Sequence, residues 1–298
     1  MKGAGLVSRT YRTLARTRAL TARSLALSPA VRQWTDARYD RRRARHADSL
    51  PTIPAADADL VAELDRSWVA SRSFRPSDDV LASADRFVER LRHTESRESC
   101  LRISPAEHAT DPTVFAWGLQ PALLDLAECY IGLPVRYLGV EVKRERPYAS
   151  DRHDDVLRHW HTDHEDRRML KVIVYLSDVD VQSGPFEYLD RRSTERAMRA
   201  VSFRRGDGAP AATVIDEVVP QSERRRLTGP RLTAVYADTS RVMHRVMVPV
   251  TTDRYSMTFV YASTALFYAY PHFMLPRKAL TQLRHQLTDR QQRALTMV

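Results

Sequence analysis

Cysteine is scarce in this sequence, and long hydrophobic runs are missing from its N-terminal region. Cys100 and Cys129 are the only cysteines among 298 residues, so we expect neither a disulfide framework nor a cysteine-based metal site. Both lie in apolar stretches of helical pattern, which predicts buried, reduced residues of a cytoplasmic protein. No run near the N-terminus is long enough for a secretory signal or a transmembrane segment.

Acidic residues are also scarce near the N-terminus. Residues 1–48 hold one Lys and eleven Arg but three Asp, which leaves almost none of the net charge of +10 to the rest of the chain. This basic arm, residues 1–50, is compatible with a transit peptide or with peripheral contact with anionic lipid or a partner. The alternative is a solvated or self-packed helix. No aromatic or Gly-rich recognition module accompanies the arm, which argues against nucleic acid as a partner.

Residues 51–298 are expected to form one domain that begins with helices, over 51–133. Apolar residues recur at helical spacing over 55–70, and Ser77-Asp78-Asp79 offers cap residues for a second helix. A third helix is expected to begin near Asp111-Pro112, where proline suits a first turn, and to run to Gly132.

The pattern changes from helical to strand-like after residue 134. A polar helix is expected over 276–296. Helices first and strands afterwards favour an α+β chain whose second part, residues 134–263, is a β-sandwich or barrel. The expected strands are 137–143, 169–176, 186–189, 232–236, 245–250 and 255–262.

The segment 190–230 interrupts the strands and is rich in arginine. A long irregular segment inside a compact β domain is usually a lid, a binding loop or a disordered insertion. Its arginines favour an anionic small-molecule substrate, such as a carboxylate, a phosphate or an acyl-carrier conjugate.

His161, Asp163 and His244 are the candidate metal ligands. His161 and Asp163 are two residues apart, so on an extended strand both side chains point to the same side and can bind one ion. Two imidazoles and one carboxylate on one face of a metal are typical of non-haem iron(II) oxygenases, in which the opposite face stays open for co-substrate and dioxygen. The carboxylate of Asp163 fills the corner that a halide would need, which favours hydroxylation or desaturation over halogenation.

Arg254, ten residues after His244, is the candidate carboxylate-binding residue, and Ser256 would face the same side of its strand. An inward-facing arginine in a β-barrel is costly unless an anion meets it, and a dicarboxylate co-substrate would provide that anion. The alternative is a structural ion pair with Asp253 or Glu187. Lys171 and Tyr175 are further candidates for co-substrate binding, although strand residues of these types more often pack or extend along the sheet.

Other histidines compete for the metal. His159 and His164 flank the pair closely, but we expect them to be outer or surface groups. His272 is the rival of His244 as the distal ligand. Trp160 is expected to be a wall of the core.

The sequence from His161 to Asp180, with the later Ser183-Gly184-Pro185-Phe186 turn and strand, resembles the phytanoyl-CoA dioxygenase family. The resemblance covers about residues 120–262, with His161, Asp163, His244 and Arg254 as its anchors. It implies a double-stranded β-helix (a cupin-like jelly roll) with N-terminal helices packed on it. Two departures stand out: Leu189 to Ser193 replaces the Pro-Gly-Ser-His turn that is common in the family, and the Arg-rich segment follows it.

The resemblance implies an iron(II)- and 2-oxoglutarate-dependent dioxygenase that hydroxylates a small or carrier-bound metabolite. His161, Asp163 and His244 would bind iron, and Arg254 would bind the far carboxylate of 2-oxoglutarate. Two alternatives remain. One is a metal-dependent cupin-like enzyme that does not use 2-oxoglutarate, and the other is a non-catalytic binding protein with the same fold.

Overall fold

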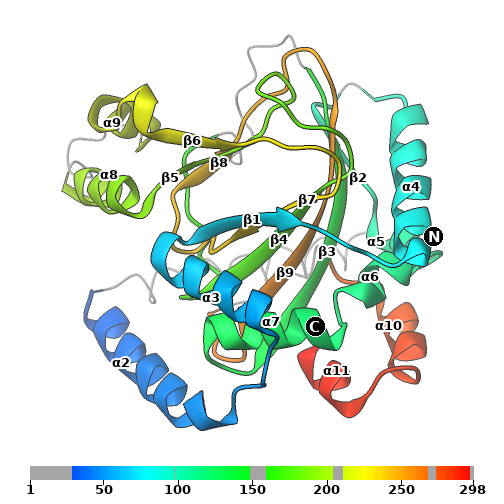
Figure 1. Cartoon of the computed structure of the whole chain (residues 1–298), viewed down its shortest axis with the longest axis horizontal. Coiled ribbons are helices and arrows are strands. Elements are labelled where there is room, and N and C mark those ends of the chain that lie inside the picture. The colour runs from blue at the N-terminus through cyan, green and yellow to red at the C-terminus, as the bar shows by residue number, and fades with distance from the viewer. Residues whose placement is uncertain (1–28, 97, 148–158, 204–210, 268–272, 296–298) are drawn as a thin grey trace, which may run out of the picture.

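The chain combines helices with two antiparallel sheets, which confirms the α+β prediction (Figure 1). The computed structural model describes residues 29–96, 98–147, 159–203, 211–267 and 273–295. His272 and most of the basic arm, residues 1–28, lie outside these ranges.

The first two predicted domain helices are confirmed. The third is divided at Gly118 into α6 and α7, and the C-cap of α7 is Gly132, with a φ of 76° that suits glycine. The helical part comprises α2 (Pro29–His46), the 3-10 turn η1 (Ala47–Ser49), α3 (Ala55–Ser67), α4 (Asp78–His93), α5 (Pro105–His108), α6 (Thr113–Trp117) and α7 (Pro121–Ile131).

The larger sheet has six strands in the order β1-β7-β4-β9-β3-β2, and the smaller has three in the order β6-β5-β8. All pairings within them are antiparallel. The larger sheet contains β1 (Val69–Ser73), β2 (Cys100–Arg102), β3 (Val135–Glu145), β4 (Met169–Tyr175), β7 (Thr233–Ala237) and β9 (Arg254–Ser263). The smaller contains β5 (Phe186–Leu189), β6 (Arg224–Leu227) and β8 (His244–Val246).

The two faces of the larger sheet differ because side chains alternate along each strand. On β9, Met257, Phe259 and Tyr261 join the main hydrophobic core, which also includes side chains of α3, α4, α6 and α7. Thr258, between them in sequence, faces the other side, where it lines a cavity. The helices therefore cover one face of the sheet, and the opposite face is left for a site.

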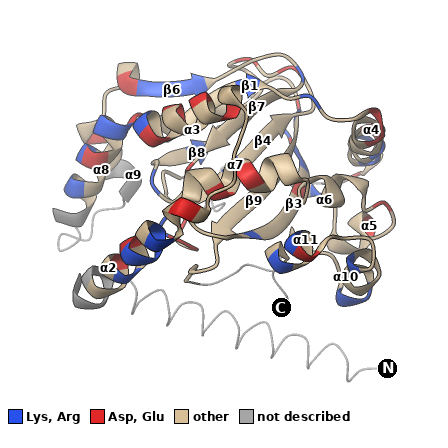
Figure 2. Cartoon of the chain, turned by 60° about the horizontal axis from the view of Figure 1, so that its bottom comes forward, with Lys and Arg blue, Asp and Glu red and all other residues tan. Residues whose placement is uncertain are grey.

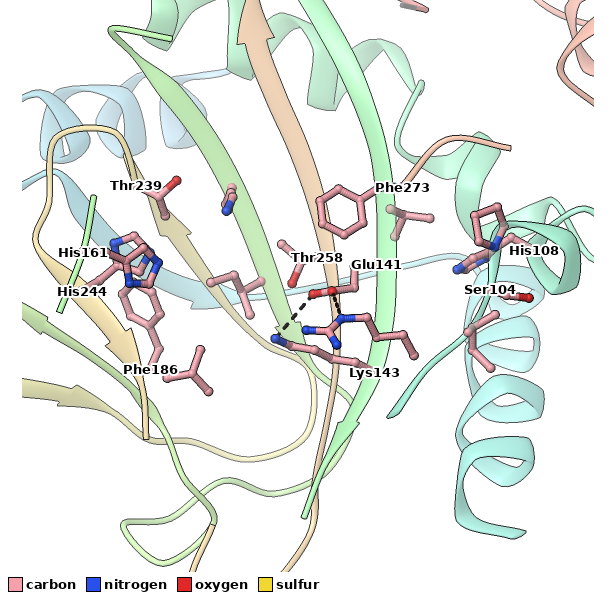
Figure 3. A pocket seen from close by; sticks show the side chains of 17 residues that line it. Ser104, His108, Glu141, Lys143, His161, Phe186, Thr239, His244, Thr258 and Phe273 are labelled. Atoms are coloured by element: carbon pink, nitrogen blue, oxygen red, sulfur yellow. Dashed lines mark hydrogen bonds and ion pairs between the residues drawn. The ribbon is translucent and has the colours of Figure 1, made fainter. Parts of the chain in front are cut away.

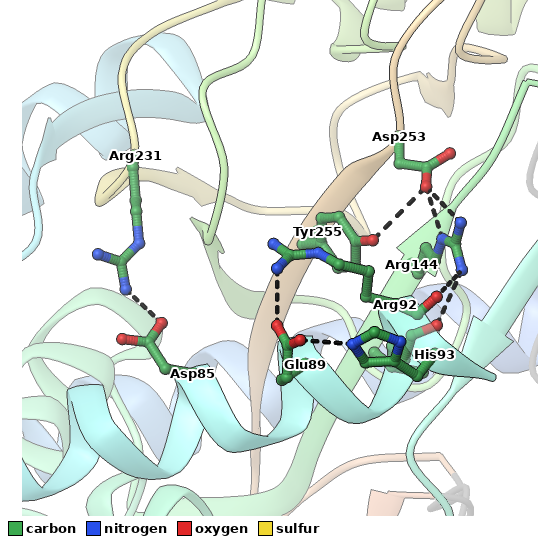
Figure 4. Close-up of polar contacts among 9 residues, drawn as sticks. Asp85, Glu89, Arg92, His93, Arg144, Arg231, Asp253 and Tyr255 are labelled. Carbon is green, nitrogen blue, oxygen red and sulfur yellow. Dashed lines mark hydrogen bonds and ion pairs between the residues drawn. The ribbon is translucent and has the colours of Figure 1, made fainter.

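Helix α4 is fastened to strand β3 of the larger sheet by contacts of Arg144 (Figure 4). Arg144 on β3 donates to Asp253 at 2.6 Å and to the carbonyl oxygens of Leu91 and Arg92 at 2.9 and 3.1 Å. Charge-assisted hydrogen bonds of this kind fix orientation as well as contributing stability. They hold α4 in place beside β3.

The described parts of the Arg-rich segment contain helices, contrary to the irregular structure expected. Arg191–Phe203 forms α8, Ala211–Val218 forms α9, and the 3-10 turn η4 (Gln221–Glu223) leads into β6. Ala197 of α8 and Ile215 of α9 pack with Trp160 in a separate hydrophobic cluster, so Trp160 is a core wall as predicted. Several arginines form ion pairs within the segment or with its neighbours: Arg191–Glu195, Arg196–Glu223, Arg224–Asp216 and Arg226–Glu187.

The described part of the basic arm packs on the domain. Tyr39 of α2 is buried, and Asp36 of α2 accepts a hydrogen bond from Arg167 at 2.6 Å. Figure 2 shows blue, basic positions along this helix. A self-packed helix, one of the two interpretations of the arm, therefore describes residues 29–46.

The C-terminal region also differs from the prediction, because α10 (Arg277–Arg284) and α11 (Asp289–Ala294) replace the single helix expected over 276–296. Thr288 begins α11 with a capping box. Both cysteines are free, and Cys100 is buried as predicted, but Cys129 is half-buried. No helix in the described ranges is long and apolar enough to span a membrane.

Candidate metal centre

Backbone pairing brings the three predicted ligands together from two segments. His161 and His244 form an antiparallel bridge in which each N–H donates to the other carbonyl oxygen at 3.0 Å. The N–H of Asp163 donates to the carbonyl oxygen of Thr239 at 2.8 Å. Strand β8 thus holds His161, and the turn before it holds Asp163.

Both imidazoles are oriented by their own backbone. Nδ1 of His161 lies 2.8 Å from the carbonyl oxygen of His159, and Nδ1 of His244 lies 3.0 Å from that of Val242. A carbonyl oxygen only accepts, so Nδ1 carries the proton in each ring and Nε2 keeps the lone pair. This is the orientation that a metal-binding histidine needs.

The ligand atoms are close enough to share one ion. One ligand atom from each of His161, Asp163 and His244 lies within 4.8 Å of the other two. Among the described residues, this is the one group of His, Cys, Asp or Glu side chains close enough to hold a metal ion. Nε2 of His161 lies 3.9 Å from Oδ1 of Asp163, and the two imidazole centroids are 4.3 Å apart.

The charges of the cluster suit a divalent cation. Burial favours the neutral acid for Asp163, but Lys171, whose Nζ lies 2.6 Å from Oδ2, and the two imidazoles lower the pKa of the carboxyl well below its ordinary value. Burial lowers the pKa of His244 to about 3, so this imidazole is neutral at pH 7. An ionised carboxylate beside neutral imidazole is the donor state that binds metal.

A cavity of about 570 Å³ opens beside the cluster (Figure 3). His161 and His244 lie at one end of it, and His108 of α5 lies at the other. Its lining comes from both sheets and from the segment that joins β2 to α5. The lining residues are Arg102, Ile103, Ser104, Pro105, His108, Val140, Glu141, Lys143, His161, Lys171, Ile173, Phe186, Thr239, His244, Val246, Thr258 and Phe273.

Arg254 and Ser256 lie on β9, on the same strand face as Thr258 but further from the cavity, which they do not line. Arg254 donates to the carbonyl oxygen of Gly184 and has Glu145 at 3.9 Å. The two acids proposed as its alternative partners are engaged elsewhere, Asp253 by Arg144 and Glu187 by Arg226 and Arg245.

Two buried donors on β9 lack partners among the described residues. Within the described ranges, neither Nε of Arg254 nor Oγ of Ser256 has a hydrogen-bond partner. Leaving a buried donor unsatisfied costs free energy, and an anionic oxygen at this position would remove that cost. The pair therefore fits a carboxylate-bearing ligand.

Lys171 and Tyr175 lie on the inner face of β4 but differ in their contacts. Lys171 lines the cavity and pairs with Asp163, so it contacts a candidate metal ligand. The hydroxyl of Tyr175 donates to the carbonyl oxygen of Leu227 at 2.7 Å and accepts from the N–H of Phe186 at 3.3 Å. These bonds join the two sheets, and a co-substrate contact by Tyr175 stays a prediction.

His159 and His164 are not members of the metal-competent cluster, in keeping with the outer roles expected for them. Of the described arginines in 190–230, none lines the cavity. The charge of that segment therefore gives no support to an anionic substrate.

Sequence reasoning missed the polar residues at the middle and far end of the cavity. Glu141 and Lys143 alternate on β3, and this period-2 pattern of charge inside a predicted strand could have indicated an inward polar face. His108 is the last residue of a one-turn helix, and no spacing to other residues in the sequence marks it as part of a site.

The sequence matches no protein-family model and no curated protein. Among solved structures, it is similar to the non-heme alpha-ketoglutarate-dependent carbocyclase SnoK from nogalamycin biosynthesis, with a TM-score of 0.52 and 15% identity over 78% of this chain and 94% of that one. It is also similar to the epimerase SnoN in complex with Fe3+, alpha-ketoglutarate and nogalamycin RO, with a TM-score of 0.50 and 17% identity over 73% of this chain and 88% of that one. For AviO1 from Streptomyces viridochromogenes Tue57, the TM-score is 0.50 and the identity is 16% over 74% of this chain and 100% of that one.

These identities are too low to carry activity from one chain to another. They confirm the sequence resemblance at the level of the fold. The chain shares the fold of the carbocyclase SnoK and the epimerase SnoN.

Proposed function

We propose that this chain is an iron(II)- and 2-oxoglutarate-dependent dioxygenase that hydroxylates a small molecule. The observation that carries the proposal is the cluster of His161, Asp163 and His244, in which both Nδ1 atoms are tied to backbone carbonyls and the three ligand atoms converge. The two sheets would form the double-stranded β-helix that the sequence resemblance implies, within one domain spanning residues 51–298. A cytoplasmic location stays a prediction.

Arg254 and Ser256 would bind the far carboxylate of 2-oxoglutarate. Their unsatisfied donors support this role, since both are buried and share one face of β9. Glu145, the acid nearest to Arg254, is also paired with Lys143 at 3.1 Å. That second cation offsets the negative charge of Glu145, so the guanidinium keeps attraction for an incoming carboxylate.

Iron(II) with 2-oxoglutarate and dioxygen would supply an oxidant able to remove hydrogen from a substrate C–H bond. The residues of the chain set the geometry around it. Lys171 holds the second carboxylate oxygen of Asp163, which leaves Oδ1 facing His161. Phe186, Ile173 and Val246 give the cavity apolar walls that exclude water near the metal.

One observation favours a second function, a metal-dependent enzyme of the same fold that does not use 2-oxoglutarate. The guanidinium of Arg254 already contacts the carbonyl oxygen of Gly184 and the carboxylate of Glu145. In that case Arg254 would be structural, and its replacement would leave catalysis intact.

Succinate formation tests the proposal. The iron-loaded protein, given 2-oxoglutarate in air, should release succinate slowly even without its substrate, and His244→Ala should abolish the release. Arg254→Lys keeps the charge but loses the two-pronged geometry, and it should raise the 2-oxoglutarate concentration needed. Metal binding without succinate release, unchanged by Arg254→Lys, would instead support the second function.

A further inference from the structure

His108 is a buried histidine at the end of the cavity remote from the metal cluster (Figure 3). It is 3% exposed, and its ring packs edge-on against Phe87 at a centroid distance of 4.8 Å. In the part of the chain that the structure describes, neither ring nitrogen has a hydrogen-bond partner. A fully buried imidazole with both nitrogens unsatisfied is costly, so its presence calls for a partner from outside the protein.

The acids near His108 do not supply that partner. Glu107 is engaged by the Ser104 backbone N–H and by Arg90, and Asp111 accepts from Ser83 and Arg86. Burial lowers the pKa of His108 to about 4, so the ring is neutral at pH 7. A neutral imidazole offers one donor and one acceptor.

The charged residues along the cavity are neutralised by one another. Glu141 accepts from Arg102 at 2.6 Å and pairs with Lys143 at 3.4 Å, and Lys143 also pairs with Glu145. Figure 3 shows Glu141 and Lys143 between the two ends of the cavity. No unpaired charge among the described lining residues therefore meets a ligand at the His108 end, where Ile103 contributes an apolar wall.

We propose that His108 recognises an uncharged hydroxyl group on the substrate, at the end of the cavity opposite the metal. A hydroxyl both donates and accepts, which matches the two unsatisfied nitrogens. The substrate class is then a neutral molecule with an apolar body and a remote hydroxyl, not an anion. Only the position of the oxidised carbon, at the metal end, rests on the proposed function.

Two probes that differ by one hydroxyl group, benzyl alcohol and toluene, test the assignment by ligand-observed NMR on the full-length protein. His108→Phe keeps the packing against Phe87 but removes both polar atoms, and it should weaken benzyl alcohol binding about tenfold without weakening toluene. His108→Gln retains a donor and an acceptor, and it should keep benzyl alcohol affinity within about twofold. In protein-observed spectra of the wild type, benzyl alcohol but not toluene should shift the ring resonances of His108.

Equal effects of His108→Phe on both probes, or no effect on either, would overturn the assignment. Cobalt(II) binding, measured on the same samples, separates this outcome from failure of the proposed function. The His108 variants should bind cobalt like the wild type. A wild type that binds benzyl alcohol through His108 but binds no cobalt would refute the dioxygenase and leave the hydroxyl site standing.

Discussion

At the scale of single residues, the metal cluster depends on a carboxylate that is ionised although it is largely buried. Asp163 is paired with Lys171 at 2.6 Å, and the side chains are 11% and 19% exposed. Removing one partner of such a pair leaves the other charge buried and unpaired. Breaking the pair therefore costs more stability than forming it contributes. Lys171 thus stabilises the donor set while no metal is bound.

Replacing Lys171 with methionine should show this dependence. In the metal-free protein, Lys171→Met should lower the free energy of unfolding by about 3 kcal/mol, because Asp163 loses its cation. Cobalt(II) then becomes the only cation beside Asp163, so the metal-induced rise in the melting temperature should exceed that of the wild type. Calorimetry with and without cobalt measures both, and equal rises in the two proteins would contradict the account.

His108 should make stability depend on pH. Burial lowers its pKa to about 4 in the folded protein, below the ordinary value of 6.5, so the unfolded state takes up a proton first as the pH falls. The stability due to the neutral ring is complete above pH 6.5 and is lost between pH 6.5 and 4. At pH 5 the loss should be about 2 kcal/mol relative to pH 8.

Urea unfolding at pH 8 and pH 5 measures this loss. His108→Phe should remove about 2 kcal/mol of the pH dependence that the wild type shows. An unchanged difference between the two pH values in the variant would mean that His108 titrates normally.

At the scale of elements, the register of β3 against β9 depends on one glycine. Gly139 follows a β-bulge at Tyr137 and has a φ of 106°, a backbone conformation that other residues rarely adopt. A Cβ atom there would also collide with the backbone carbonyl of Phe273, a residue of the cavity lining.

Gly139→Ala should lower the free energy of unfolding by about 2 to 3 kcal/mol. The alanine would be strained at a positive φ, and its Cβ would collide with backbone atoms, which cannot move aside as a side chain can. Chemical denaturation measures the change. Gly229→Ala is the comparison, because the three atoms nearest to a Cβ there belong to the side chain of Thr233, which can move, and its φ lies outside the left-handed region. A loss in Gly229→Ala as large as in Gly139→Ala would argue against a special role for the bulge.

Sequence pattern predicted the central strands well because their alternation reflects burial on one face. The strands β4, β5 and β9 lie close to their expected ranges. The sequence pattern did not predict β1 and β2. Both strands are short, and pairing with the neighbouring strands of the sheet stabilises them. The pattern failed for α8 because arginine-rich composition hid the apolar positions Ala197, Met198 and Val201.

The metal cluster was predictable for a different reason. His161 and Asp163 are two residues apart in sequence, and His244 was singled out as the distal histidine with Arg254 ten residues after it. The partner of Lys171 and the contacts of Tyr175 were not predictable, because both depend on which loop or sheet faces β4.

At the scale of the whole molecule, α2 joins the N-terminal arm to the segment that follows the His-x-Asp pair. Arg167, four residues after Asp163, pairs with Asp36 and stacks on Tyr39 at 5.1 Å and on Phe267 at 4.2 Å. Packing of the arm therefore supports the backbone beside the metal cluster.

Tyr39→Ala should lower the free energy of unfolding by about 3 kcal/mol, as expected for the loss of a buried aromatic ring. It should also weaken cobalt(II) binding, because the segment after Asp163 loses a support. Thermal unfolding and cobalt titration measure the two effects. Trp34→Ala on the same helix, where the side chain is 60% exposed, is the control and should change neither. Normal cobalt affinity in Tyr39→Ala would mean that the arm and the site are independent.

Anaerobic titration with iron(II) and 2-oxoglutarate tests the central claim most directly, since chelation of the metal by the co-substrate gives a weak visible charge-transfer band. The account predicts this band in the wild type, its appearance only at much higher co-substrate concentration in Arg254→Ala, and its absence in His161→Ala. A wild type that binds iron(II) without the band at saturating 2-oxoglutarate would contradict it.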